Sequence, residues 1–265
     1  MIQLARRLAR MTSISTLAAL LCWSMPALST PKLQVAAAAD LAMCIGELNA
    51  AFAKSVGGAD VRSSIGSSGN FFAQIKNGAP FDVFLSADTY YPSQLVSAGL
   101  ADGATLTVYA HGQLMMWTTD PRVDVALGLR LLNDPGIRRV AIANPDVAPY
   151  GRAAKAVLQK AGLWDALKPK LVLGENVAQV AQFVGSGNAQ VGFVDVAHLQ
   201  SGNSAARGWA WPVPADLYPL IEQGGVVTAK GRGNPLARKY LDFLQSETGR
   251  SVLRKFGFAL PADHS

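Results

Sequence analysis

The stretch "DVRSSIGSSGNFFAQIKNGAPFDVFLSAD", residues 60–88, contains a strand, a loop, a helix and a second strand. Residues 59–62 form a β-like run, and "SSIGSSGN" at 63–70 is rich in serine and glycine. "FFAQIKNG" then predicts a helix that ends at Gly78. "FDVFLSA" at 81–87 predicts a buried strand. This order is typical of the β-α-β units that build a parallel sheet.

The same alternation extends to both sides of this stretch and repeats later in the chain. "KLQVAAAA" predicts a strand before a helix over residues 41–56, and "QLVSAGL" predicts a helix that ends near Gly99. A second set of three strands and two helices is predicted across residues 138–196. The amphipathic segment "NPLARKYLDFLQSE" predicts a helix near the end of the chain. The chain therefore has the pattern of an α/β protein.

Two extended segments link the two sets of strands. "TLTVYAHGQLMMWTT" at 105–119 is long and β-rich, and "GGVVTAKG" near the end offers a second crossing. We therefore expect two lobes, each a mostly parallel sheet flanked by helices, with a cleft between them. The expected boundaries place residues 32–110 and 228–265 in the first lobe and residues 111–227 in the second.

The N-terminus has the pattern of an export signal. Residues 1–29 contain three arginines, then the apolar run "LAALLCW" and the small-x-small sequence Ala27-Leu28-Ser29. This order predicts a cleavable signal peptide and a periplasmic protein. Leu21 directly before Cys22 disfavours a lipoprotein, because lipid attachment needs a small residue at that position.

Composition argues against several function classes. The formal charge of +6 falls to about +3 without residues 1–29, and the remaining basic residues are scattered, so we expect no nucleic-acid partner. Only Cys44 remains after removal of the signal, and its helical surroundings predict a buried thiol. The three histidines lack metal-binding spacing, and neither a G-x-S-x-G elbow nor a phosphate loop is present. We therefore expect no enzyme activity and no cofactor.

Small or polar residues stand where strands lead into predicted helices. Asp40, Ser68, Tyr150 and Asn176 hold such positions, and the strand that ends at Asp195 adds a fifth. The first N–H groups of a helix have no intrahelical partner and bind anions. An ordinary N-cap explains any one of these positions by itself. If the positions converge at the ends of the two sheets, they predict an anion site.

The chain resembles the periplasmic molybdate-binding proteins of ABC importers, which have the two-lobed type II solute-binding fold. The resemblance runs from "VAAAADL" through residues 63–88 and "IANPDVAPYGRAAKAVLQKAGLWDALKPKLVLGENVAQ" to "LQSETGRSVLRKFGFALP". "QIKNGAPFDVFLSAD" carries its most specific part. The resemblance implies that a monomer encloses molybdate or tungstate without a counter-cation. It also implies delivery to an ABC transporter permease and its ATPase.

Carried over by position, the resemblance implies ligand contacts from Ser68, Tyr150, the backbone N–H of Val177, and the Ala39-Asp40 turn. These groups would contact the oxygens of molybdate. Asp40 and Asp195 depart from relatives that have serine or asparagine at the first position and, in a subgroup, tyrosine at the second. The preferred interpretation is that the Asp40 carboxylate turns back to cap its own helix.

Two alternatives remain open at this point. The ligand could be another small anion such as sulfate. In a different class, the protein could be an exported hydrolase that uses Asp40 and Asp195 as catalytic carboxylates.

Overall fold

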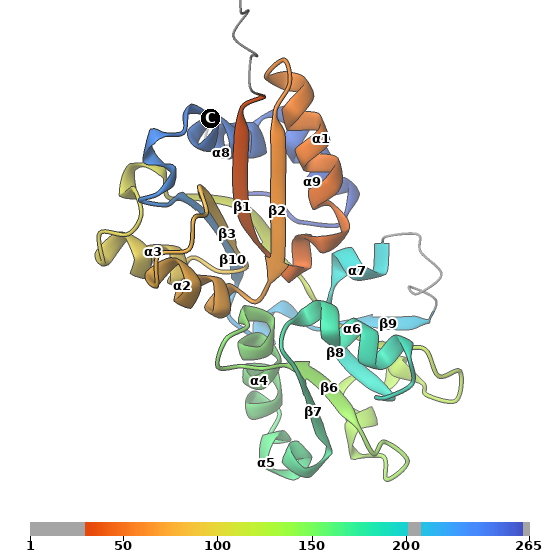
Figure 1. The fold of residues 1–265 in the computed structure, drawn as a ribbon. Helices are drawn as coiled ribbons and strands as arrows, with labels where there is room; N and C mark the ends of the chain where they lie inside the picture. Colours follow the sequence, from red (N-terminus) through yellow and green to blue (C-terminus); the bar gives the residue numbers. More distant parts are fainter. Residues whose placement is uncertain (1–29, 201–207, 262–265) are drawn as a thin grey trace, which may run out of the picture.

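Two five-stranded sheets form the centres of two lobes, which lie one above the other in Figure 1. The computed structural model describes residues 30–200 and 208–261. The strand order is β2-β1-β3-β10-β4 in the first sheet and β7-β6-β8-β5-β9 in the second. The predicted two-lobed α/β class is confirmed, and the predicted signal peptide lies outside the described residues.

The first lobe combines elements from both ends of the chain. Its strands are β1 (Lys32–Ala38), β2 (Asp60–Gly66), β3 (Val83–Ser86), β4 (Thr107–Gly112) and β10 (Ile221–Val227). Its main helices are η1 (Ala39–Met43), α1 (Ile45–Ser55), α2 (Ser68–Lys76), α3 (Tyr90–Ser97), α8 (Pro235–Gln245) and α9 (Glu247–Lys255), with short turns η2 (Gly103–Thr105) and η7 (Gly231–Gly233).

The second lobe is built from the middle of the chain. Its strands are β5 (Leu114–Thr118), β6 (Val140–Ala143), β7 (Leu171–Gly174), β8 (Val191–Asp195) and β9 (Trp209–Pro212). Its helices are η3 (Val125–Asn133), α4 (Pro149–Lys160), α5 (Trp164–Leu167), η4 (Lys168–Lys170), α6 (Val177–Gly185), α7 (Val196–Gln200) and η6 (Ala215–Leu217).

The sheets are mixed, and in each the reversed strand is the one that enters from the other lobe. In the first sheet, β10 pairs antiparallel with β3 and β4, whereas β1 pairs parallel with β2 and β3. In the second sheet, β5 pairs antiparallel with β8 and β9, whereas β6 pairs parallel with β7 and β8. The predicted crossing at 105–119 corresponds to β4 and β5. The antiparallel strands were missed because periodicity gives no strand direction.

The second crossing comes earlier in the chain than the expected boundary at residue 228. Residues 221–227 form β10, which is hydrogen-bonded on both sides within the first sheet. The expected division gave these residues to the second lobe. We therefore propose a revised boundary between β9 and β10, which leaves the whole first sheet in one lobe.

Each sheet is covered by apolar cores. One face of the first sheet packs on α1, α8 and α9 around Leu48, Phe52 and Tyr240, and the other packs on α2 and α3 around Phe71 and Leu95. Helices α4 and α6 cover the second sheet. Cys44 is a buried free thiol, as predicted, and its burial raises its pKa well above the usual range.

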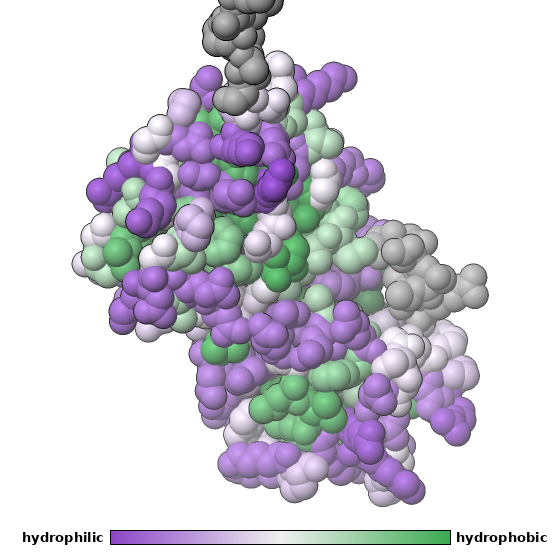
Figure 2. Space-filling view, in the orientation of Figure 1, coloured by the Kyte–Doolittle hydropathy of each residue, from purple (hydrophilic) through white to green (hydrophobic). Residues whose placement is uncertain are grey.

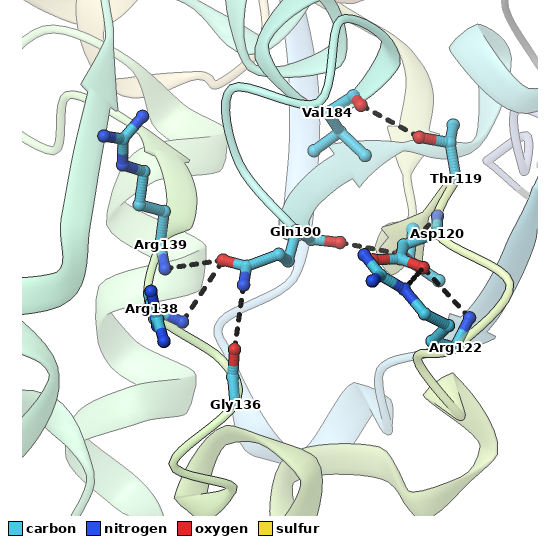
Figure 3. A network of polar contacts seen from close by, with 9 residues as sticks. Thr119, Asp120, Arg122, Gly136, Arg138, Arg139, Val184 and Gln190 are labelled. Atoms are coloured by element: carbon cyan, nitrogen blue, oxygen red, sulfur yellow. Dashed lines mark hydrogen bonds and ion pairs between the residues drawn. The ribbon is translucent and has the colours of Figure 1, made fainter.

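A polar network around Gln190 connects the segments that precede β6 and β8 in the second sheet (Figure 3). These segments lie at the end of the sheet opposite the helix N-termini. The Gln190 side chain accepts from the backbone N–H groups of Arg138 and Arg139 at 3.2 and 2.9 Å, and it donates to the Gly136 carbonyl at 2.8 Å. These bonds hold the starts of β6 and β8 together. They leave the carboxyl ends of the strands to the loops that lead into α4, α6 and α7.

The face in Figure 2 mixes hydrophilic and apolar areas, and one apolar area stands out on the second lobe. This area lies where Figure 1 places β7, an edge strand whose Leu173 is 52% exposed. Within residues 30–200 and 208–261, none of the helices has the length and apolar character needed to cross a membrane.

Candidate functional site: an interlobe pocket at helix N-termini

A small pocket lies where the two lobes meet. In this structure the pocket is almost closed, with room for about one water molecule. The lining residues come from both lobes: Ala38, Ala39, Asp40, Gly66, Ser67, Ser68 and Ala87 from the first, and Ala148, Pro149, Tyr150, Asn176 and Val177 from the second.

Four helix starts converge on this pocket, those of η1, α2, α4 and α6. Each follows the carboxyl end of a strand, which places the unpaired N–H groups of its first turn at the interface between the lobes. Three of these helices, α2, α4 and α6, are long enough to add a macrodipole with its positive end toward the pocket. The arrangement suits a small anion.

Ser68 is positioned to donate into the pocket. The serine at the N-cap of α2 is Ser67, whose Oγ accepts from the Asn70 N–H, and Ser68 is the first helical residue. Ser68 Oγ accepts from the Ala87 N–H at 3.0 Å and is buried. Because a hydroxyl has one proton of its own, this acceptor bond leaves the Ser68 O–H available as a donor.

The loop between β2 and α2 is shorter than the serine- and glycine-rich stretch at 63–70 predicts. β2 extends to Gly66, so residues 63–65 belong to the strand, and α2 begins at Ser68 rather than Phe71. Serine has low strand propensity, but pairing of β2 along all of β1 overrides it. The hydroxyls left at the pocket are those of Ser67 and Ser68.

Tyr150 and Val177 enter the pocket from the second lobe. Tyr150 follows Pro149 at the start of α4, and its hydroxyl lies 3.4 Å from Gln223 Nε2. Val177 is the first residue of α6, directly after the Asn176 N-cap, whose side chain accepts from the Gln179 N–H at 3.1 Å. The Asn176 cap leaves the Val177 N–H without an intrahelical partner.

The Asp40 side chain does not cap its own helix, contrary to the preferred interpretation. In the described structure, η1 receives no side-chain cap bond, and the Asp40 carboxyl turns inward, with 1% exposure. Its Oδ2 accepts a short hydrogen bond from Gln223 Nε2 of β10. Its Oδ1 is buried and has no hydrogen-bond partner within the described chain. The difference arises because Gln223 reaches Asp40 from a strand far away in sequence.

Burial raises the pKa of Asp40 to about 7, and the nearby Asp195 carboxylate adds to the effect. The hydrogen bond from Gln223 and the nearby His198 oppose this rise in the pKa but do not cancel it. Burial also raises the pKa of the Tyr150 hydroxyl well above its usual range, with Asp40 as the next cause. Tyr150 therefore keeps its proton and remains a donor.

The structure does not bring Asp195 to the pocket wall. Asp195 ends β8, is fully buried, and accepts from the His198 N–H at 3.1 Å. Its other carboxylate oxygen lies 2.5 Å from His198 Nδ1. Burial lowers the pKa of His198, but the Asp195 carboxylate outweighs burial and the net shift is upward. Asp195 thus holds the start of α7.

Contacts between the lobes close the pocket. The Gly69 N–H donates to the Val147 carbonyl at 2.8 Å, and Asn70 Nδ2 donates to Glu175 Oε1 at 2.7 Å. Gly69 has no space for a side chain, because an added Cβ would lie 2.8 Å from the backbone of Val147 in the second lobe. A glycine at this position permits the close approach of the two lobes.

Arg152 forms a second bridge between the lobes. Its guanidinium donates a short hydrogen bond to Asp88 and lies 3.2 Å from the Tyr91 hydroxyl, both in the first lobe. It also lies over the Tyr91 ring, 5.1 Å from the centroid. Asp88 directly follows Ala87 of the pocket wall, and Arg152 lies two residues after Tyr150. Arg152 is thus engaged by two side chains of the first lobe.

The geometry gives the hydrolase alternative little support. An acid–base pair needs both carboxyl groups at the reacting atoms. Asp40 lines the pocket, whereas Asp195 lies behind it and is bonded to His198. The described residues also contain no cluster of three metal-ligating side chains.

Sequence reasoning missed several residues of the site. Ser67, Ala87 and Ala148 line the pocket, Gln223 bonds to Asp40, and Tyr109 bonds to Gln223. Ser67 directly precedes the predicted Ser68, and Ala148 lies two residues before the predicted Tyr150, so local signals could have included them. Gln223 and Tyr109 gave no local signal, because only the pairing of β4 with β10 brings them to the site.

Comparisons with known proteins agree with this architecture. The family described as "Bacterial extracellular solute-binding protein" matches residues 33–259. The molybdate-binding protein ModA of Azotobacter vinelandii is 38% identical over 229 residues, which cover 86% of this chain and 90% of the relative. ModA of Rhodobacter capsulatus is 41% identical over 213 residues, which cover 80% of this chain and 82% of the relative.

Solved structures support the same relationship. The periplasmic molybdate-binding protein of Azotobacter vinelandii superposes with a TM-score of 0.80 at 35% identity, over 86% of this chain and 99% of that chain. The sulfate-binding protein SubI of Mycobacterium tuberculosis has a TM-score of 0.70 at 16% identity, over 88% of each chain, which shows a shared fold only. The chain therefore belongs to the bacterial extracellular solute-binding protein family, among the relatives of the molybdate-binding proteins.

Proposed function

We propose that this protein captures molybdate or tungstate in the interlobe pocket and delivers it to an ABC transporter. The convergence of four helix starts on one small pocket carries the proposal. Relatives that are 38% and 41% identical are molybdate-binding proteins, which supports this choice of ligand.

The ligand contacts that we propose come from both lobes. Ser68 donates its hydroxyl, Tyr150 its phenol O–H, and Val177 and the Ala39-Asp40 turn their backbone N–H groups. Fixed donors hold an oxyanion without a counter-cation, because helix dipoles and charge-assisted hydrogen bonds stabilise the charge. The donors bind the oxygens of the anion, and no side chain coordinates the molybdenum atom. Asp195 is not among these contacts.

Selectivity for the ligand follows from size. Molybdate and tungstate are larger than sulfate, so a pocket closed around them leaves donors out of reach of sulfate oxygens. A buried donor without an acceptor costs about 1–3 kcal/mol. Two such donors would reduce sulfate binding by roughly two to four orders of magnitude.

Calorimetric titration of the protein without residues 1–29 tests this function. We expect tight binding of molybdate and tungstate at a ratio of one, and weak or no binding of sulfate and phosphate. Sulfate binding as tight as that of molybdate would refute the proposed ligand. Hydrolysis of a substrate that depends on Asp40 and Asp195 would refute the proposed class.

The proposal extends to location and partners. Residues 1–29 have the pattern of a cleavable signal peptide, which supports a periplasmic location. We propose that the protein acts as a monomer and passes its ligand to a permease with an associated ATPase. Co-purification with the permease and ATPase in the presence of molybdate would test this step.

A further inference from the structure

The buried carboxyl of Asp40 conflicts with an anion site next to it. A carboxylate beside a bound dianion would repel it, yet Asp40 is 1% exposed and lines the pocket. No lysine or arginine of the described chain forms an ion pair with it, and Arg152 is engaged by Asp88. The one titratable group near Asp40 that can be cationic, His198, is bonded to Asp195.

The orientation of Gln223 fixes the hydrogen bonding around Asp40. The Tyr109 hydroxyl donates to Gln223 Oε1 at 2.8 Å, so the amide Nε2 points toward Asp40 and lies 3.4 Å from the Tyr150 hydroxyl. Gln223 Nε2 therefore contacts both Asp40 Oδ2 and the Tyr150 hydroxyl, which places these two side chains next to each other. Gln223 and Tyr109 come from the adjacent strands β10 and β4, so the framework that holds Asp40 is part of the first sheet.

The protonation state of Asp40 decides how many O–H donors the ligand can use. Tyr150 has a single O–H, and an ionised Asp40 beside it would compete with the ligand for that proton. If Asp40 carries a proton, the Asp40 and Tyr150 side chains together have two O–H groups. One can bond within the pair, and the other is left for the ligand. That extra donor can face the pocket, where Asp40 Oδ1 has no partner within the described chain.

We propose that Asp40 takes up a proton when the oxyanion is captured, and that the neutral Asp40–Tyr150 pair supplies one hydrogen-bond donor to the ligand. The inference rests on the proposed function and deepens it. Capture of the ligand then depends on pH, and release is favoured at higher pH.

The groups that face Asp40 come from every element packed around it. They are Asp195 of β8, His198 of α7, Tyr150 of α4, Tyr109 of β4 and the Cys44 thiol next to η1. Of these, Asp195 raises the pKa of Asp40 and His198 lowers it, while burial is the largest cause of its rise. A bound dianion would raise this pKa further, because a second negative charge disfavours the carboxylate.

Calorimetry of molybdate binding in Tris and in HEPES at about pH 8 measures the proton uptake, because the two buffers release protons with different enthalpies. We expect roughly one proton per molybdate for the wild type, and affinity that falls by up to about tenfold per pH unit above neutrality. The Asp40→Asn variant should take up none, and its affinity should stay flat over the same range. The matched control combines Asp195→Asn with His198→Gln. It removes the neighbouring buried pair as a unit and should retain the uptake.

Infrared difference spectra of the wild type with and without molybdate give a second readout that needs no variant to fold. A carboxylic acid C=O band that grows on binding supports the proposal. Molybdate binding without proton uptake in the wild type overturns it, and so does uptake that persists in Asp40→Asn but is lost in the control. If the wild type binds no molybdate at any pH, the proposed function itself is refuted.

Discussion

The Arg152 bridge should set how long the ligand stays bound. Arg152 lies in the second lobe, and its partners Asp88 and Tyr91 lie in the first, so the bridge exists only when the lobes are together. The Arg152 side chain is 38% exposed and that of Asp88 is 16% exposed. A charge-assisted hydrogen bond contributes about 1.5–3 kcal/mol, and an exposed ion pair about 0.2–1 kcal/mol. The half-buried bridge should stabilise the closed form by about 1–2 kcal/mol after allowance for solvent screening.

Replacement of Arg152 by methionine keeps the aliphatic stem and removes the charge. The dissociation rate of molybdate should rise by roughly 5- to 30-fold, because ligand release requires the lobes to separate. The association rate should change little. Stopped-flow fluorescence of the bound and free forms measures both rates, and high salt should reduce the difference between the variant and the wild type.

Arg122→Met provides the control, because Arg122 forms an ion pair with Asp120 in the second lobe alone. A double-mutant cycle with Arg152→Met and Asp88→Asn isolates the pair itself. A dissociation rate that stays at the wild-type value in Arg152→Met would refute the reasoning. If Arg122→Met raises the dissociation rate of molybdate as much as Arg152→Met does, the cause is the loss of one positive charge and not the loss of the interlobe bridge.

Three further predictions follow from the site. Ser68→Ala should weaken molybdate binding by about 1.5–3 kcal/mol in calorimetry, and it should also lower the thermal midpoint of the free protein, because the Ala87 N–H loses its acceptor; a lower midpoint with unchanged molybdate affinity would show a structural role only. Gly69→Ala should hold the lobes apart, because the new Cβ would meet Tyr91 and Val147; scattering should then show no compaction with ligand. The free energy of unfolding should fall as pH rises from 3.8 to about 7, because folded Asp40 binds its proton more tightly than the unfolded chain does. The slope should flatten in Asp40→Asn, and an identical slope in denaturant titrations would argue against the raised pKa.

Local patterns in the sequence determined much of the architecture. The helix that ends at Gly78 and the strands that contain residues 83–86 and 140–143 were predicted because periodicity and helix-ending residues act within a few positions. The helix starts near Ser68, Tyr150 and Val177 followed from the same signals. The sequence also indicated an anion site, because several helix starts came after strands of parallel units.

The tertiary structure alone decided how Asp40 behaves. An N-cap was a reasonable expectation from local sequence, since aspartate at the start of a helix usually bonds its own backbone. Gln223 redirects the carboxyl from a position 183 residues away, and it does so because β10 returns from the second lobe into the first sheet. Asp195, next to the pocket in the predicted topology, instead pairs with His198. Arg152 reaches Asp88 only when the lobes close. Strand direction, register and lobe closure place such side chains through contacts between distant segments, and no local pattern in the chain records those contacts.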